Sequence, residues 1–92
     1  MISLTETSTA RLLFLCREEH ASAIAIQVYE DKLRFRLREA LVDDFVVTLD
    51  DRHSLLVDYI SMIILKGALL DFNIEKSNQR WVLECPGGVY YG

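Results

Sequence analysis

The chain has 92 residues, 51% of them hydrophobic and 26% charged, with a net charge of −4 at pH 7. This composition is typical of one globular domain over 1–92 and excludes intrinsic disorder. The longest apolar stretch, 59–70, is interrupted by Lys66 and is too short to span a membrane, and the N-terminus lacks the basic region of a secretory signal. We therefore expect a cytoplasmic protein.

The negative charge lies mostly in the second half of the chain. Basic and acidic residues balance over 1–41, and the excess over 42–92 comes largely from Asp43, Asp44, Asp50, Asp51 and Asp58. An acidic chain is repelled by nucleic acid unless its basic residues lie together on one face. Cys16 and Cys85 belong to no motif, and in a cytoplasmic protein we expect both to be reduced, buried thiols.

The first predicted element is a helix over 8–20. Ser8 or Thr7 can cap its N-terminus, and its apolar residues fit one broad helical face: Leu12, Leu13, Leu15 and Cys16. A strand over 12–17 is the alternative, but the polar ends and the length of the segment favour the helix.

A β-hairpin over 23–38 is the clearest signal in the sequence. Pairing Val28 with Leu33 places all the alternating apolar residues on one face: Ile24, Ile26, Val28, Leu33, Phe35 and Leu37. A slip of one residue turns one strand's apolar set to the other face, so the register is well specified. The connecting segment 29–32 contains no glycine, and we therefore expect a type I-like loop rather than a tight primed turn.

A strand and a helix are predicted next. Residues 45–49 are rich in β-branched side chains, which favours a strand. Asp50 or Asp51 can cap a helix over 52–66, and Gly67 suits its C-terminal end. This helix carries an unusually wide apolar stripe, made by Leu55, Leu56, Tyr59, Ile60, Met62, Ile63 and Ile64. The stripe either packs only against the chain's own core, or it also contacts a second copy of the chain or another partner. Both explanations stay open.

A second hairpin closes the domain. Opposing Ile74 to Trp81 gives the further cross-strand pairs Phe72–Leu83, Leu70–Cys85 and Glu75–Arg80 around the polar loop 76–79. Pro86 ends the last strand because it lacks a backbone donor. The segment 86–92 is interpreted as a mobile tail, with a docking segment as the alternative.

These elements predict an α+β fold in the order α-β-β-β-α-β-β. Its antiparallel sheet has about five strands, and the helices pack on one face. The apolar face of the first hairpin is expected to pack on the helix over 52–66. The order of elements resembles that of small acidic secretion chaperones, although no motif carries this resemblance.

No motif for catalysis or metal binding is present. Cys16 and His20 have the spacing of two ligands on one helix face, but His53 and Cys85 must be brought to them by the fold, and no second close pair exists. The same residues are the weak basis for a small enzyme with a His/Cys site. We therefore expect no catalytic residue, no metal and no cofactor.

The paired aspartates do not form a calcium loop. Asp43-Asp44 and Asp50-Asp51 lack the alternating acids, the glycine and the final glutamate of an EF-hand. Helix capping and solubility are the more ordinary roles of such residues.

A row of arginines is the best feature for a binding surface. Arg34, Arg36 and Arg38 alternate with apolar residues, so they share one face of a strand at a spacing of about 7 Å. Tyr29 lies on the same face of the partner strand, where it can stack on a base. An ordinary solvated face is the simpler explanation, and a single-stranded nucleic acid or an acidic protein is the functional one.

The leading functional hypothesis is a non-enzymatic protein-binding domain, such as an inhibitor, immunity protein, chaperone or adaptor. It rests on the acidic stretch and on the wide apolar helix. The predicted partner-binding residues are Asp43, Asp44, Asp50, Asp51 and Asp58, and the partner is a protein that is basic or itself binds nucleic acid. The alternatives are a nucleic-acid binder that uses Arg34, Arg36, Arg38 and Tyr29, and the small His/Cys enzyme.

Overall fold

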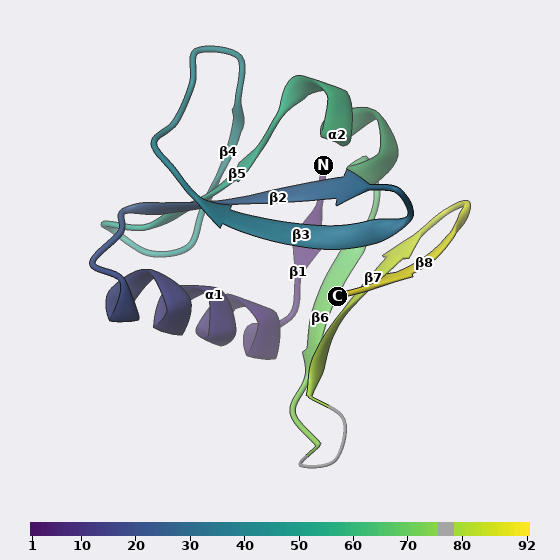
Figure 1. Ribbon diagram of the computed structural model, residues 1–92, viewed down its shortest axis with the longest axis horizontal. Coiled ribbons are helices and arrows are strands. Elements are labelled where there is room, and N and C mark those ends of the chain that lie inside the picture. The colour runs from purple at the N-terminus through teal and green to yellow at the C-terminus, as the bar shows by residue number, and fades with distance from the viewer. Residues whose placement is uncertain (76–78) are drawn as a thin grey trace.

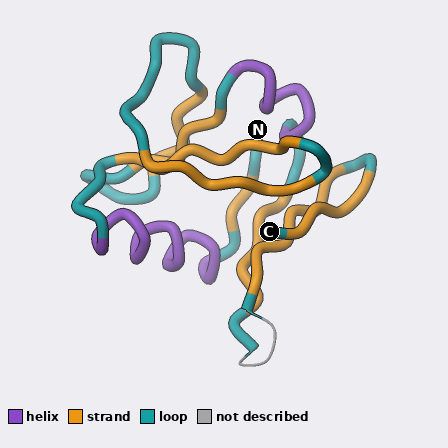
Figure 2. The backbone as a smooth tube through the Cα atoms, viewed as in Figure 1, coloured by secondary structure: helices purple, strands orange, loops and turns teal. Residues whose placement is uncertain are grey.

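A computed structural model describes residues 1–75 and 79–92. Ten elements follow one another in the order β1 (Ser3–Leu4), α1 (Glu6–Glu18), β2 (Ala23–Tyr29), β3 (Lys32–Leu37), β4 (Phe45–Thr48), β5 (Ser54–Val57), α2 (Tyr59–Leu65), β6 (Leu69–Asn73), β7 (Arg80–Cys85) and β8 (Gly88–Tyr91). Figure 1 shows their arrangement, and Figure 2 shows how strands dominate the described chain. None of the described helices is long and apolar enough to cross a membrane.

The strands form two sheets. One has the order β1-β6-β7-β8 and the other the order β3-β2-β5-β4, and each contains one parallel pair, β1 with β6 and β2 with β5. The prediction of an α+β fold is correct at this level. The predicted single antiparallel sheet and the predicted order of elements are partly wrong.

Helix α1 agrees with the helix predicted over 8–20. It begins two residues earlier, where the Thr5 hydroxyl caps it by accepting a hydrogen bond from the Ser8 N–H. The hydroxyls of Thr5 and Thr7 both donate to the Asp71 carboxylate on β6, at 2.6 and 2.7 Å. These bonds lower the pKa of Asp71 and tie the first turn of the helix to the sheet.

The first hairpin has the predicted register. Val28 pairs with Leu33, Ile26 with Phe35 and Ile24 with Leu37. The turn prediction is wrong, because Glu30 and Asp31 both have positive φ, 50° and 61°, as in a type I′ turn. The right-handed twist of the two strands favours this primed turn even without glycine.

The predicted helix over 52–66 is divided in the structure. Its first part is strand β5, in which Leu55, Leu56 and Val57 are fully buried. A strand covered on both faces is apolar at consecutive positions, so it does not show the alternation of a half-exposed strand. Asp58, not Asp50 or Asp51, caps the short helix that follows, and its carboxylate accepts the Ser61 N–H at 2.7 Å.

The second hairpin forms with a register two residues away from the predicted one. Phe72 faces Trp81, and Asn73 rather than Glu75 faces Arg80. A shift of two residues leaves every side chain on its predicted face, so apolar patterning does not distinguish the two registers. Residues 76–78 of the predicted loop lie outside the described residues.

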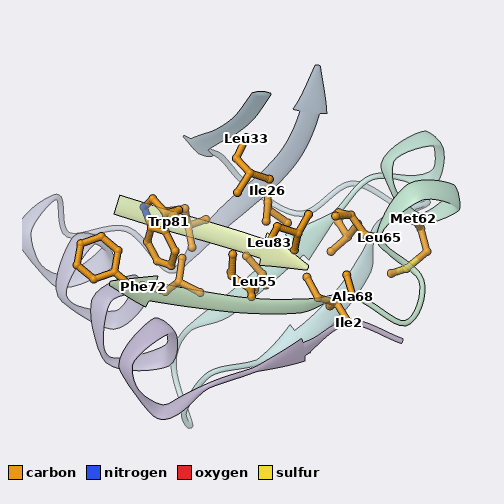
Figure 3. Packing of buried hydrophobic residues seen from close by; sticks show 14 of the residues in the cluster. Ile2, Ile26, Leu33, Leu55, Met62, Leu65, Ala68, Phe72, Trp81 and Leu83 are labelled. Carbon is orange, nitrogen blue, oxygen red and sulfur yellow. The ribbon is translucent and has the colours of Figure 1, made fainter. Parts of the chain in front are cut away.

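One core joins the two sheets and the helices (Figure 3). Ile24, Ile26 and Leu33 of the first hairpin pack in a cluster with residues of α1, β5, β6 and β7. Helix α2 contributes only Met62 and Leu65 to it, so it is not the main cover of the hairpin as predicted. The Trp81 ring lies between aromatic neighbours on both sheets, with centroids 4.5 Å from Phe35 and 4.8 Å from Phe72.

The C-terminal segment is part of the sheet. Residues 88–91 form β8 against β7, and Gly92 exchanges two backbone hydrogen bonds with Trp81, at 3.0 and 3.1 Å. This placement differs from the mobile tail expected for 86–92. A Cβ on Gly92 lies only 2.9 Å from the Leu33 Cβ, so the last residue fits against the first hairpin because it has no side chain.

We predict that Gly92→Ala destabilises the protein by about 1–3 kcal/mol, the usual cost of overpacking a close contact. The added methyl group must push Leu33 or the end of β8 aside. Gly87→Ala is the matched control, because its Cβ meets no atom within 4 Å. Urea unfolding of both variants measures the difference. Equal midpoints contradict the close packing of Gly92.

Candidate functional site

The two thiols occupy different environments. Cys16 on α1 is fully buried and lines a cavity of about 380 Å³ together with His20 and His53. Burial, with a smaller contribution from the nearby Asp50 carboxylate, raises the pKa of this thiol. Both features favour a neutral, unreactive thiol.

A hydrogen-bond network beside this cavity fixes the end of α1. His53 Nδ1 lies 2.8 Å from one Asp50 carboxylate oxygen, which also accepts the Arg52 N–H at 2.8 Å. The other oxygen accepts from Arg17 of α1 at 3.2 Å. The Arg52 N–H and the His53 ring lower the pKa of Asp50 to about 2. The network therefore joins the end of α1 to the loop between β4 and β5.

Cys85 lies at the turn that joins β7 to β8. It pairs with Gly88 across the turn and is partly exposed. Burial raises the pKa of this thiol as well. The following residue, Pro86, is next to Gly67 at the end of α2, where a Cβ would stand 3.9 Å from the proline ring.

The structure does not assemble the four possible zinc ligands. Cys16, His20 and His53 share a cavity, whereas Cys85 belongs to the β7–β8 turn and does not line that cavity. Over residues 1–75 and 79–92 no group of three or more His, Cys, Asp or Glu side chains could hold a metal ion.

The predicted acidic contact residues fall into two groups. Asp43, Asp44 and Asp58 line a cavity of about 510 Å³ that also includes Tyr29. Asp50 and Asp51 line a second cavity, of about 430 Å³, toward the other end of β4. The two groups therefore flank the strand rather than form one surface.

Asp44 forms a largely buried ion pair. Its carboxylate accepts two hydrogen bonds from Arg38, at 2.6 and 3.0 Å, and one from the Leu41 N–H at 2.7 Å. The Asp44 side chain is 2% exposed and that of Arg38 is 18% exposed. The hydrogen bond from Arg38 is the main reason why the pKa of Asp44 is lowered. This pair holds the loop between β3 and β4.

The arginine row is only partly free. Arg34 lies over the Tyr29 ring at 5.3 Å, Arg36 is exposed, and Arg38 is occupied by Asp44. The Arg38–Asp44 pair was not predicted from the sequence. The two residues carry opposite charges and lie on either side of a turn, and this pattern was the signal in the sequence that could have predicted the pair.

We predict that Asp44→Ala costs about 3–5 kcal/mol of unfolding free energy, because it leaves a mostly buried guanidinium without its partner. Replacing both Asp44 and Arg38 by apolar residues costs less than the single change. Because folding lowers the pKa of Asp44, the pair stabilises fully above the ordinary aspartate pKa of about 3.9 and is lost as pH falls through the folded value. Urea unfolding at pH 7 and at pH 3 measures both effects. A single variant as stable as wild type contradicts this role.

Comparison with known proteins identifies the fold. No family model matches the sequence, and no curated protein is significantly similar to it. A crystal structure of IscA with the [2Fe-2S] cluster has a TM-score of 0.69 and 18% identity, over 94% of this chain and 86% of that one. SufA of Escherichia coli, involved in the biosynthesis of iron–sulfur clusters, has a TM-score of 0.74 and 21% identity, over 92% and 85%.

The functional predictions made from sequence are corrected by this result. An inhibitor, immunity protein, chaperone or adaptor, a single-stranded nucleic-acid binder and a small His/Cys enzyme are all wrong classes for a chain with these structural neighbours. The predicted basic or nucleic-acid-binding partner and the homodimer through 52–66 are withdrawn with them. The chain is similar in fold to IscA and SufA over nearly its whole described length.

Proposed function

We propose that this chain takes part in iron–sulfur cluster biogenesis, as a non-catalytic protein of the cytoplasm that handles cluster components as cargo. The supporting observation is the likeness to SufA, with a TM-score of 0.74 over 92% of this chain. Two free thiols are in keeping with a reducing compartment.

The residues do not fit a complete cluster held by one chain. A [2Fe–2S] cluster takes four protein ligands, usually cysteine thiolates, and this chain has two cysteines. Cys16 has no exposed surface. The described residues also contain no group of three potential ligands. A single chain is therefore expected to contact the cargo at one thiol rather than enclose it.

Cys85 is the residue best placed for that contact. It is partly exposed and belongs to a turn, so an incoming ion or cluster reaches it without opening the core. Because its pKa is raised, the thiol is protonated at neutral pH, and binding of iron releases that proton. Binding through Cys85 is therefore expected to strengthen as pH rises.

We predict that anaerobic incubation with ferric iron and sulfide gives a visible sulfur-to-iron absorption band that depends on Cys85. Cys85→Ser removes this band. Cys16→Ala is the matched control and keeps it, because the buried thiol acts as a small apolar residue. The band is lost on desalting, since one ligand per chain does not retain the cargo.

Circular dichroism before the incubation shows that both variants are folded. A wild-type chain that develops no band, or a Cys85→Ser variant that develops the same band, contradicts the proposed contact. A cluster that survives desalting contradicts the single-thiol account.

A further inference from the structure

Arg11 of α1 is held between two aromatic rings. Its guanidinium carbon, Cζ, lies 5.0 Å from the centroid of the Phe14 ring on the same helix, and 5.0 Å from the centroid of the Phe72 ring. Phe72 is buried and projects from β6 toward α1 (Figure 3). A guanidinium over aromatic rings at this distance makes cation–π contacts. The two rings therefore fix the position of the positive charge.

This guanidinium has no ionic partner among the described residues. The ion pairs of that part of the chain use Arg17, Arg38 and His53 as their basic members. The Arg11 Nε is buried and has no hydrogen-bond partner there. A buried polar group without a partner has lost its water and gained nothing in exchange. The positive charge of Arg11 is therefore partly desolvated, while its terminal nitrogens stay open to a ligand.

A cavity of about 290 Å³ lies beside the guanidinium. It is lined by Arg11 together with Thr7, Ala10, Phe14, Phe72, Ile74 and Gln79. None of the described residues that line it is acidic. The closest carboxylate in this part of the sequence, Asp71, accepts hydrogen bonds from Thr5 and Thr7. The cavity therefore combines one positive charge with walls that are mainly apolar.

These features define the chemistry of the ligand. The two oxygens of a carboxylate match the two terminal nitrogens of a guanidinium, and the pairing is strong and directional. The apolar walls favour an apolar group attached to that carboxylate, because such a group gains by leaving water. The volume of the cavity leaves room for a molecule of roughly ten non-hydrogen atoms.

We propose that this cavity binds a small carboxylic acid with an apolar body. The carboxylate pairs with the terminal nitrogens of Arg11, and the body packs against Phe14, Phe72 and Ile74. The inference goes beyond the proposed iron–sulfur role and does not depend on it. Gln79 directly precedes β7 and Cys85 ends that strand, so the two places are roughly 20 Å apart along it.

The test titrates phenylacetate into the full chain labelled with nitrogen-15 and follows binding by NMR. Wild type is expected to bind it with a dissociation constant of about 1 mM, and the shifted amides are expected to lie in residues 7–14 and 72–74. Phenylacetamide has the same shape without the charge, and acetate has the charge without the apolar body. Each is expected to bind at least about tenfold more weakly.

Two variants test the role of the arginine. Arg11→Gln keeps a polar side chain without the charge and is expected to weaken phenylacetate binding about tenfold or more. Arg36→Gln is the matched control, because it removes one positive charge from an exposed position on β3 and is expected to leave binding unchanged. Circular dichroism shows whether both variants are folded.

The proposal is overturned if wild type does not bind phenylacetate up to about 20 mM, or if phenylacetamide binds equally well. Unchanged binding by Arg11→Gln, or an equal loss in Arg36→Gln, overturns it as well. If Arg11→Gln does not fold, the comparison of phenylacetate with phenylacetamide on wild type still decides whether the cavity recognises the carboxylate.

Discussion

The parallel pairing of β5 with β2 determines most of what is distinctive in this structure. Strand β5 lies between β2 and β4, and Leu55, Leu56 and Val57 are completely buried there. If residues 54–57 formed a helix, the sheet β3-β2-β5-β4 would lack one of its two central strands. Because the chain must leave the sheet after Val57, Asp58 begins a short helix whose outer residues are exposed, and β4 becomes the edge of the sheet.

The sequence predicts some parts of this fold reliably and not others. The first hairpin was predicted with its register because apolar residues alternate strictly on both strands, and only one register keeps them together. The apolar run from Leu55 to Ile64 was assigned to one helix. Continuous apolar residues are compatible with a buried strand as well as with a helix, and periodicity does not distinguish them. The exposure of Ile60 and Ile63, both 75%, shows how incomplete the helical burial is.

The candidate site was harder to predict for a related reason. Its residues are defined by long-range placement: Cys16 on α1 is buried in the core, and Cys85 lies partly exposed at the turn where β8 returns along β7. Asp44 was expected on a contact surface, but it is almost fully covered by its pairing with Arg38. A sequence gives the charge of such residues, whereas the fold decides whether that charge is offered to a partner or used internally.

The likeness in fold supports the proposed function. IscA and SufA have the same overall arrangement at low sequence identity, while the single accessible thiol of this chain separates it from a protein that encloses a cluster by itself. We therefore propose a small protein that contacts iron–sulfur cargo at Cys85 without retaining it.

The most direct test of this account is made in the native cell, by measuring the activity of iron–sulfur enzymes after the chain is deleted. The account predicts a loss of activity that wild-type protein restores and the Cys85→Ser variant does not. Unchanged activity of those enzymes in the deletion strain, or full restoration by Cys85→Ser, would contradict it.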